Sequence, residues 1–515
     1  MKPMTLNRRN FLFGSAAAMT LAGCNTAKTG LRPRKPGERL NFALVGCGIQ
    51  GRGLLGGFLK QKDILVRAVC DCDRIRREES AKTVVSYYAT KEKPAMNVDC
   101  AALADFRDIV NDPTIDVVCI ATPDHWHAYI AVEMMKHGKD VYCEKPLTYN
   151  VDEARKVMAA AEKYGRVFQT GAMQRSWDNF RTAVMVVRNG IIGDVHHVDA
   201  NFGNVDIVLG GPSNVHRFFD KPENAATEGA PNPDCDWDMW LGPAPWAPYS
   251  DQLAPRGVNK FYPMFWRFDD HYGAGYTGDW GAHHLDIAQW GLDLDKSGPV
   301  KVIRSDEPYS QLAVHGCRRQ TGMKFVIRKA YGDVIMEHRP AGVWGTVFYG
   351  TKGIVAVNRG KIAVWLGDGA KVVPDAALRK QLDEGTYAGM KAVVCSIAKD
   401  YGTQATERKD DKLATAVKTL KETFALEKAK VQVYDSLKDG SHIGNFVRCC
   451  LTREETCSTA ETGARASILC QLCNLSYVYD TGFDWDPVKN DFANGTGHGI
   501  SLKRDYCRNG WEVVV

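Results

Sequence analysis

The sequence predicts an α/β fold class, with an N-terminal doubly wound parallel sheet and a C-terminal α+β region whose sheet is open and mostly antiparallel. Three observations predict it. Short apolar runs alternate with helix candidates over residues 39–163, which is the pattern of βαβ units. A glycine-rich turn follows the first of these runs. From residue 164 to 515, strand candidates separated by turn residues replace that pattern.

The composition is that of an ordinary globular protein. A chain of 515 residues is long enough for about two to four domains. Apolar residues make up 44% and charged residues 25%, and the net charge of +5 comes without any long run of Lys or Arg. We therefore expect no nucleic-acid partner and no phospholipid-binding surface, while a neutral small molecule is an acceptable substrate.

The first 24 residues have the features of an export signal. Arg8 and Arg9 form a twin-arginine pair, and the apolar run from Phe11 to Leu21 is shorter than the roughly 20 residues that span a bilayer. Small residues then precede Cys24, as in a lipoprotein cleavage box. We predict a signal peptide over residues 1–24 and a mature chain that begins at an acylated Cys24.

This prediction sets the expected location of the protein. Residues 25–38 are rich in Lys, Arg, Gly and Pro and are predicted to form a tether. The protein is expected at the periplasmic face of a bacterial membrane, which it would contact only through its lipid anchor. Twin-arginine export carries folded proteins, so a tightly bound cofactor would travel with the chain.

A glycine motif joins the first predicted strand to the first helix. The strand candidate Leu40–Val45 is followed by Gly46–Gly51, which has the spacing G-x-G-x-x-G, and a helix candidate covers Arg52–Lys60. A second strand candidate, Ile64–Cys70, ends at Asp71. Strand, glycine turn, helix and acidic strand end in this order predict a Rossmann unit that binds a dinucleotide.

The individual positions of the glycine motif have separate physical roles. Gly46 permits the tight turn, Gly48 lets the backbone approach a pyrophosphate, and Gly51 lets the helix pack against the strand. The backbone around Ile49 and Gln50 would present free N–H groups of a helix N-terminus to the phosphates. These residues are therefore candidate cofactor contacts.

The acidic end of the second strand bears on which dinucleotide is bound. Asp71 would accept a hydrogen bond from the ribose 2′-hydroxyl and would repel a 2′-phosphate, which favours NAD over NADP. Arg74 would favour NADP if it reached the ribose, although an exposed Arg on a loop is usually only solvated. Asp73 is an alternative ribose contact.

Two further strand ends carry polar motifs. The strand candidate Ile115–Ala121 ends in Thr122–His127, before a helix candidate at Tyr129–Lys136, and the strand candidate Asp140–Cys143 ends in Glu144–Pro146. Ligands of doubly wound sheets bind beyond the carboxyl ends of the strands. The candidate cofactor contacts in these two motifs are Thr122, Pro123, His125, His127, Glu144 and Lys145.

A downstream helix candidate, Trp280–Leu292, carries the predicted catalytic groups. Asp279, His283 and Asp286 have helical spacing and share one face, whereas His284 points elsewhere. Oxidising a secondary alcohol requires loss of the hydroxyl proton, which a His can accept near neutral pH. A nearby carboxylate can orient that His.

The Lys145 ammonium would stabilise negative charge that develops on the alcohol oxygen. A helix start with an Asp cap and a buried His is the structural alternative for Asp279 and His283.

These motifs together resemble the Gfo/Idh/MocA family of sugar and inositol dehydrogenases. The residues that carry the resemblance are Gly46–Gly51, Asp71, Thr122–His127, Glu144–Pro146 and Gly278–Asp286. The resemblance implies a nicotinamide cofactor, a sugar-like substrate, catalytic roles for Lys145, Asp279 and His283, and a homo-oligomer built on the open sheet. It also implies cofactor or substrate contacts after the strand candidate Arg166–Phe168, at Gln174 and Arg175. Trp266 and Arg267, which precede the catalytic helix, are further candidate contacts. A structural role is the alternative for each of these four residues.

The C-terminal region contains strand candidates, an aromatic-rich stretch and helix candidates. Its predicted strands are His196–Phe202, Val302–Ser305, Met323–Arg328, Val334–His338, Gly345–Tyr349 and Gly353–Asn358. The stretch Leu209–Phe265 is rich in aromatic residues, of which Trp237, Trp240, Trp246 and Tyr249 could stack on sugar rings or pack a large loop. Residues 375–430 are interpreted as a helical surface insertion without chemistry. A helix candidate covers Ser458–Tyr479.

We expect no metal site. Of the 16 cysteines, Cys470 and Cys473 have half of a metal-ligand spacing, but they fall in a helix candidate and lack a second pair. The expected function is transfer of a hydride between NAD and a secondary alcohol of a sugar, glycoside or polyol. An NAD-dependent glycosidase that works by transient oxidation and elimination is an alternative, and a non-catalytic sugar- or cofactor-binding protein is another.

Overall fold

The computed structural model describes residues 37–92, 94–201, 229–258, 265–275, 277–304, 324–339, 342–367, 372–397, 411–434 and 439–515. The predicted signal peptide, Cys24 and nearly all of the tether lie outside the described residues, so their assignment stays a prediction. Within the described ranges, no helix is both long and apolar enough to span a bilayer.

The N-terminal sheet is parallel throughout and has the strand order β3-β2-β1-β4-β5-β6. Its strands are β1 (Leu40–Val45), β2 (Ile64–Cys70), β3 (Ala101–Leu103), β4 (Val117–Ile120), β5 (Asp140–Cys143) and β6 (Phe168–Thr170). All residues of β4 and β5 are buried, as expected for central strands that helices cover on both faces. This order confirms the predicted doubly wound fold, and its reversal between β1 and β4 places a ligand site there.

The helices of this half begin close to the strand ends. They are α2 (Ile49–Leu59), α3 (Arg74–Thr90), α4 (Phe106–Asn111), α5 (Asp124–Lys136) and α6 (Val151–Tyr164). Asn150 caps α6 by accepting from the Glu153 N–H, and Gly165 in the left-handed region ends it.

Three predicted boundaries were wrong. Helix α2 begins inside the glycine turn rather than at Arg52, and α5 begins at Asp124 rather than Tyr129, so the His125–His127 motif is helical. Pro123 stands at the N-cap of α5, where a residue without an N–H is tolerated. The short strand predicted at Arg166–Phe168 is β6, which lies at Phe168–Thr170.

Within the described ranges, the C-terminal sheet has ten strands in the order β14-β13-β12-β11-β7-β10-β9-β8-β15-β16. All its neighbours are antiparallel except β7 and β10, which are parallel, so the predicted mostly antiparallel sheet is confirmed. The strands are β7 (Val195–Asn201), β8 (Lys301–Ile303), β9 (Lys324–Lys329), β10 (Gly332–Arg339), β11 (Thr346–Gly350), β12 (Gly353–Asn358), β13 (Lys361–Leu366), β14 (Lys391–Ile397), β15 (Phe483–Asp486) and β16 (Asp491–Phe492).

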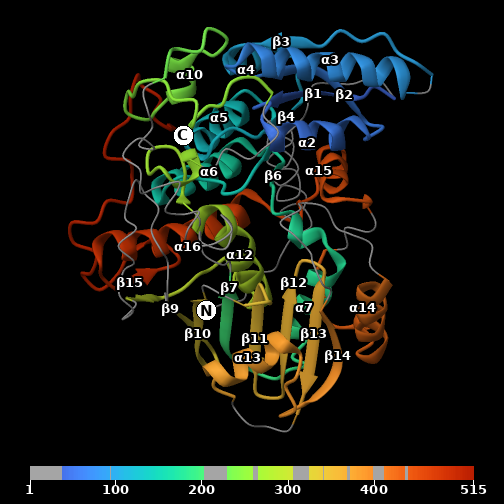
Figure 1. Ribbon diagram of the computed structural model, residues 1–515, viewed down its shortest axis with the longest axis vertical. Helices are drawn as coiled ribbons and strands as arrows, with labels where there is room; N and C mark the ends of the chain where they lie inside the picture. The colour runs from blue at the N-terminus through green and yellow to red at the C-terminus, as the bar shows by residue number, and fades with distance from the viewer. Residues whose placement is uncertain are drawn as a thin grey trace, which may run out of the picture.

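Helices connect the two sheets. In Figure 1, α12 (Ala282–Gly291) and α16 (Ala460–Tyr479) lie between the N-terminal sheet at the top and the C-terminal sheet at the bottom. Helix α16 packs against α6 on one side and against α12 on the other. A π-helical turn, Thr277–Gly281, leads directly into α12. The chain thereby brings the start of α12 close to the carboxyl ends of the strands of the N-terminal sheet.

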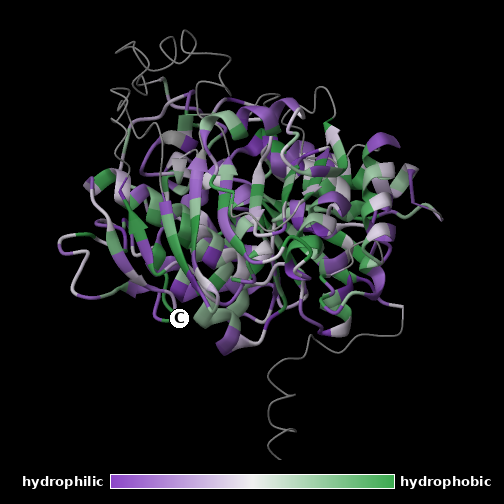
Figure 2. Ribbon diagram, turned by 90° about the horizontal axis from the view of Figure 1, so that it is seen from below, coloured by the Kyte–Doolittle hydropathy of each residue, from purple (hydrophilic) through white to green (hydrophobic). Residues whose placement is uncertain are grey.

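The other helical elements are α7 (Asp178–Arg188), α10 (Trp237–Leu241), α11 (Phe265–Phe268), α13 (Ala376–Glu384), α14 (Asp411–Thr423), α15 (His442–Thr452) and the short 3-10 turns Met173–Ser176 and Leu426–Lys428. They differ in burial: nearly all of α7 is buried, whereas α14 buries one face only. Figure 1 places α15 beside α2, although they are far apart in the sequence, and the rings of Phe446 and Phe58 meet edge to face at 6.2 Å. Figure 2 shows hydrophobic residues along the strands in the interior.

The interpretation of residues 375–430 as a helical surface insertion is correct for α13 and α14 but not for the whole stretch. This stretch contains β14, which pairs with β13 and extends the sheet at its edge. Helix α13 buries Leu378 and Leu382 against Trp344 and Trp365 of one sheet face. All residues of β14 are exposed or only partly buried, and charge-rich segments flank the strand, so its short apolar run did not stand out as a strand.

Candidate active site

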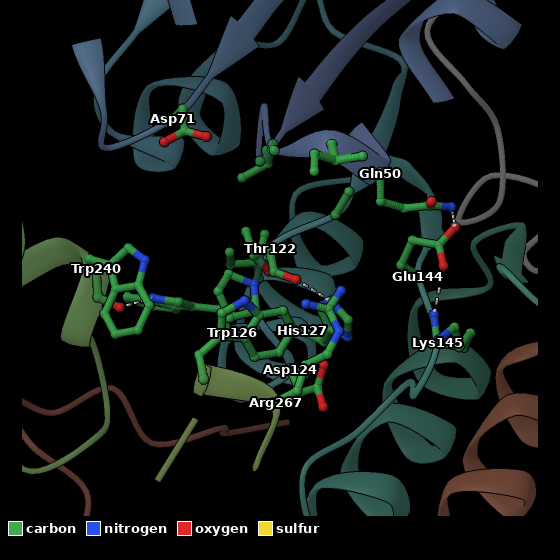
Figure 3. Close-up of a pocket in the computed structure, with 18 of the residues that line it drawn as sticks. Gln50, Asp71, Thr122, Asp124, Trp126, His127, Glu144, Lys145, Trp240 and Arg267 are labelled. Atoms are coloured by element: carbon green, nitrogen blue, oxygen red, sulfur yellow. Dashed lines mark hydrogen bonds between the residues drawn. The ribbon is translucent and has the colours of Figure 1, made fainter. Parts of the chain in front are cut away.

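A cavity of about 280 Å³ lies at the carboxyl ends of β1, β4 and β5. The glycine turn and the ends of these strands line one side, and residues that follow position 238 line the other. Figure 3 shows the side chains that converge on it. The cavity is at the reversal of strand order, as the doubly wound topology predicts.

The glycine turn is shaped to admit a phosphate group. Gly46 has φ +94°, and a Cβ atom there would fall 2.6 Å from the backbone of Ala121. A Cβ on Gly51 would fall 1.8 Å from the Gly46 carbonyl oxygen, so both positions require glycine. Gly48 instead faces open space, lines the cavity and forms the N-cap of α2 without a side-chain cap. The N–H groups at this helix end are therefore available to an anionic ligand.

Asp71 is fixed at the carboxyl end of β2 and lines the cavity. One carboxylate oxygen accepts from the Cys47 N–H at 2.7 Å and the other from the Asp73 N–H at 2.8 Å. Asp73 itself caps α3 by accepting from the Arg76 N–H, so it is occupied structurally. Of the two acids considered for the ribose contact, Asp71 is the one in the cavity.

The basic residues near Asp71 have different roles. Arg74 is exposed and pairs with Asp234 and Glu78, so it does not line the cavity. Arg76, which the sequence did not single out, does line it, and its guanidinium donates to the carbonyl oxygens of Pro255 and Gly257.

The middle of the cavity contains the motif after β4. Thr122, Pro123 and His127 line it, and the two ring nitrogens of His127 lie 2.8 and 2.9 Å from the carbonyl oxygens of Pro146 and Thr122. His125 does not line the cavity. Its ring faces the carbonyl oxygens of Tyr272 and Trp240, and burial lowers its pKa to about 3. The predicted cofactor contact at His125 does not fit this geometry.

Glu144 lies between the glycine turn and the part of the cavity that contains Lys145, Asp279 and His283, which we call the reactive end. Its carboxylate accepts from the Gln50 side-chain amide at 3.0 Å and from the Lys145 N–H at 3.2 Å (Figure 3). Burial raises the pKa of this carboxyl group. The peptide bond between Lys145 and Pro146 is cis.

The reactive end contains the three predicted catalytic side chains. Lys145 Nζ lies 2.6 Å from Asp279 Oδ1 and 2.8 Å from the Asp279 carbonyl oxygen. Arg267 Nε lies 3.6 Å from the other carboxylate oxygen. Burial raises the pKa of Asp279, but Lys145, Arg267 and Arg359 together outweigh burial and hold that pKa below its usual value. Asp279 is therefore an anion among cations.

His283 lines the same end of the cavity and is held neutral. Burial, followed by the charges of Lys145 and Arg359, lowers its pKa well below 6.5. Its Nδ1 atom is buried and makes no hydrogen bond within the described ranges. His284 instead directs Nδ1 to the Asn201 carbonyl oxygen on β7 and lies outside the cavity. A neutral His beside a Lys can accept a proton from a hydroxyl group that the Lys binds.

Two predicted contacts are placed elsewhere. Arg175 is buried and forms ion pairs with Asp286 and Asp295, so it does not line the cavity. Gln174 is also buried outside the cavity, and neither of its amide atoms has a hydrogen-bond partner in the described part of the chain. The expected contacts at Gln174 and Arg175 therefore do not fit the structure. Trp266 and Arg267 do line the cavity, with the guanidinium 4.3 Å from the Trp266 ring.

The structure adds residues that the sequence did not single out. Asp124 lines the cavity, and burial raises its pKa to about 7. Arg359 enters from the turn after β12, and Leu253 from the covering segment, residues 229–258. Trp240 also lines the cavity and stacks on Trp237 at 4.7 Å, which supports the packing interpretation of these aromatic residues. No sequence motif includes Arg359, so the sequence contained no signal that could have placed it in the cavity.

In the described part of the chain, one group of side chains has metal-ligand geometry: His197, Asp199 and Glu337. The Arg379 guanidinium already bridges Asp199 at 2.8 Å and Glu337 at 3.0 Å. It supplies the positive charge that these carboxylates need, so we assign no metal to them.

Comparisons with known proteins agree with this geometry. Residues 40–172 match the Gfo/Idh/MocA profile described as "Oxidoreductase family, NAD-binding Rossmann fold", and residues 215–329 match its "C-terminal alpha/beta domain". A "Glycosyl hydrolase family 109 protein" of Shewanella pealeana (strain ATCC 700345 / ANG-SQ1) is 28% identical over 220 residues, which is 39% of this chain and 46% of that protein. The "Uncharacterized oxidoreductase YrbE" of Bacillus subtilis (strain 168) is 36% identical over 159 residues, 31% of this chain and 43% of that protein. The matches thus span less than half of these curated relatives.

Solved structures share the fold. An NAD-binding protein from Listeria innocua has a TM-score of 0.51 at 15% identity, covering 87% of this chain and 97% of that chain. Levoglucosan dehydrogenase in complex with NADH and levoglucosan has a TM-score of 0.50 at 17% identity, covering 87% and 99%. At these identities the similarity shows the fold alone.

Proposed function

Because the chain belongs to the Gfo/Idh/MocA family of oxidoreductases, we propose that it transfers a hydride between NAD and a secondary alcohol of a sugar, glycoside or polyol. The observation that carries this proposal is the convergence of Lys145, Asp279 and His283 at one end of the cavity. The opposite end has the open glycine turn and Asp71. The cavity thus has a cofactor end, at the glycine turn and Asp71, and a reactive end, at Lys145, Asp279 and His283.

The cofactor end fits a nicotinamide dinucleotide. A Cβ on Gly48 would stand in the open space next to the free N–H groups of α2, which is where a pyrophosphate approaches. Asp71 would accept from the ribose hydroxyl groups, and its charge favours NAD over NADP. When bound, the nicotinamide accepts or returns the hydride of the substrate carbon. Trp240 and Leu253 cover this end and would slow release, which supports a tightly held cofactor.

At the reactive end, each side chain has one task. Lys145 would bind the substrate hydroxyl oxygen and stabilise the negative charge that develops on it as its proton leaves. His283 would accept that proton, because its lowered pKa keeps it neutral. Asp279 would hold the Lys145 ammonium in position through their 2.6 Å contact. In the reverse reaction, protonated His283 would return the proton to the alcohol oxygen.

A second candidate is an NAD-dependent glycosidase. The curated relatives named as glycosyl hydrolase family 109 proteins favour it. In such an enzyme, transient oxidation of a ring carbon permits elimination of the glycosidic bond before the hydride is returned. The pairing of Lys145 with Asp279, next to His283, suits a plain dehydrogenase, and the same set argues against a non-catalytic binding protein.

The test uses the purified full chain. Mass spectrometry of the material released on denaturation identifies the bound dinucleotide, and NAD is expected. A panel of sugars, glycosides and polyols is then offered. Net NADH formation supports the dehydrogenase, whereas sugar release without net redox change supports the glycosidase. A chain that binds no dinucleotide and converts none of the panel would contradict both.

We also propose that the chain is exported, lipid-anchored and oligomeric. The support for export is the Arg8–Arg9 pair and Cys24. Lys substitution of both arginines should retain the precursor in the cytoplasm, and Cys24→Ser should abolish acylation. Normal membrane fractionation of both variants would overturn this proposal. Light scattering tests the oligomer, whose expected interface is the open sheet that α13 partly covers.

A further inference from the structure

The covering segment, residues 229–258, faces the cofactor end of the cavity. Helix α10, within this segment, contributes Met239 and Trp240 to the cavity wall, and Leu253 adds a third side chain. Asp71 and the glycine turn line the same cavity from the N-terminal sheet. A dinucleotide bound there would lie between the sheet and the segment, so the attachments of the segment bear on how fast the dinucleotide enters and leaves.

On one flank, the segment is attached to the loop that follows β2. The Asp236 N–H donates to the Cys72 carbonyl oxygen at 3.1 Å, and the Arg74 N–H donates to the Asp234 carbonyl oxygen at 2.7 Å. These bonds join backbone to backbone. This part of the segment is thereby held close to Asp71 whatever its side chains are.

On another flank, the C-terminal tail, residues 500–515, holds α10. The side chain of Arg508 is buried, and its guanidinium pairs with the Asp238 carboxylate. The same guanidinium donates to the carbonyl oxygens of Asp238 at 3.0 Å and Ala244 at 3.2 Å, and the Arg508 N–H donates to the Pro243 carbonyl oxygen at 3.1 Å. One residue therefore fixes both the start of α10 and the turn after it.

Trp126 joins the tail to α10 by a second route. Its indole N–H donates to the carbonyl oxygens of Met239 at 3.1 Å and Trp240 at 3.3 Å (Figure 3). A Cβ on Gly242 would fall 2.2 Å from the Trp126 ring, so the end of α10 packs directly on that ring. The ring of Trp511, in the tail, lies edge to face with Trp126 at 5.0 Å. The tail thus contacts α10 directly and through Trp126.

On the basis of the proposed dinucleotide binding, we propose that Arg508 is a positioning residue that holds α10 closed over the cofactor end and thereby slows both entry and exit of NAD. Helix α10 has five residues and is not stable by itself, so its position depends on these contacts. Entry and exit would both pass through a form in which α10 has moved away from the cavity. The bonds of Arg508 lower the population of that form, so they lower both rates.

The test measures NADH exchange in the purified full chain. NADH fluorescence follows release after the loaded chain is mixed with excess NAD⁺, and association after the free chain is mixed with NADH. Arg508→Gln should release NADH about 10- to 100-fold faster, which is the value of a hydrogen bond to a charged group. Association should also be faster, because entry passes through the same opened form. A residue that only stabilised the bound complex would change release and leave association unchanged.

Two further variants separate this role from a general loss of packing. Arg465 is as buried as Arg508, and its guanidinium donates to the carbonyl oxygens of Ser297 at 3.2 Å and Pro487 at 2.9 Å, outside the cavity. Arg465→Gln is therefore the matched control and should keep both wild-type rates even if its thermal midpoint falls. Asp238→Asn changes a side chain that is 64% exposed, so the fold should tolerate it. It weakens the same attachment and should speed both rates, by less than Arg508→Gln does.

Wild-type rates in Asp238→Asn, or in Arg508→Gln, would overturn the inference. Faster release without faster association would overturn it too, as would equal acceleration in Arg465→Gln. All of these results leave the proposed function intact, because the chain still binds NADH. A wild-type chain that binds no NADH would instead contradict the proposed function together with the inference.

Discussion

The two ends of the cavity are built in different ways. The cofactor end consists mostly of backbone from one stretch, the glycine turn at Gly46–Gly51 and the strand end at Asp71. The reactive end consists of side chains from separate elements: Lys145 after β5, Asp279 and His283 around the start of α12, and Arg359 after β12. A backbone site tolerates change in its side chains but not in its glycines. A side-chain site depends on how distant elements pack.

The largest expected effect is at the cofactor end, which is built mostly from backbone. Gly46→Ala places a Cβ 2.6 Å from the Ala121 backbone at φ +94°, which the turn cannot relieve by a side-chain movement. We expect dinucleotide binding to fall below detection in fluorescence titration. Gly56→Ala, on α2 with open space around it, is the matched control and should bind normally. If both variants bind equally well, the cofactor end is not the rigid backbone site described.

At the reactive end, Lys145→Ala should leave the dinucleotide bound but slow hydride transfer by about 10²- to 10³-fold, because the developing charge loses its stabilising cation. Asp279→Asn should cost less if Asp279 only positions Lys145. The measurement is single-turnover reduction of bound NAD. A Lys145→Ala enzyme that loses the cofactor instead would show that the two ends are not separate.

Asp71→Ala tests the side chain that is proposed to bind the ribose at the cofactor end. Loss of its bond to the ribose should weaken NAD binding about 10- to 100-fold and narrow any preference over NADP. Calorimetric titration with both dinucleotides measures the effect. Asp105→Ala, at the partly buried N-cap of α4 and outside the cavity, serves as the control. Unchanged NAD affinity would place the ribose contact at another residue.

A smaller effect concerns pH. The proposed base, His283, can accept a proton only when it is neutral, so activity should be lost as pH falls through its pKa, which lies well below 6.5. Arg359→Gln removes a cation that lowers this pKa. The pKa should therefore rise, and the acid limb of the hydride-transfer rate should move to higher pH. Arg328→Gln, at an exposed arginine paired with Asp333, should leave the profile in place. An acid limb that stays fixed in Arg359→Gln would mean that another group titrates.

The difference between the two ends also explains what the sequence could predict. The bounds of β1, β2 and β5 matched because buried strands and a local glycine spacing leave a continuous signal. Lys145, Asp279 and His283 were predicted to act together because their motifs are recognisable, and the structure places all three in the cavity. The sequence did not single out Arg359 or Asp124, and Arg175 was predicted as a contact although it lies outside the cavity. The sequence does not distinguish an arginine that lines the cavity from one that is buried against Asp286, because only the packing separates the two. Edge strand β14 was missed because it lies half-exposed among charged residues.

The proposed proton transfer depends most directly on His283. Single-turnover hydride transfer to bound NAD should be about 10²- to 10⁴-fold slower in His283→Ala than in wild type, with the cofactor retained, because the hydroxyl proton loses its acceptor. His284→Ala, whose ring bonds the Asn201 carbonyl outside the cavity, should slow the same step far less. Unimpaired transfer in His283→Ala, or an inactive His284→Ala beside an active His283→Ala, would contradict the proposed chemistry.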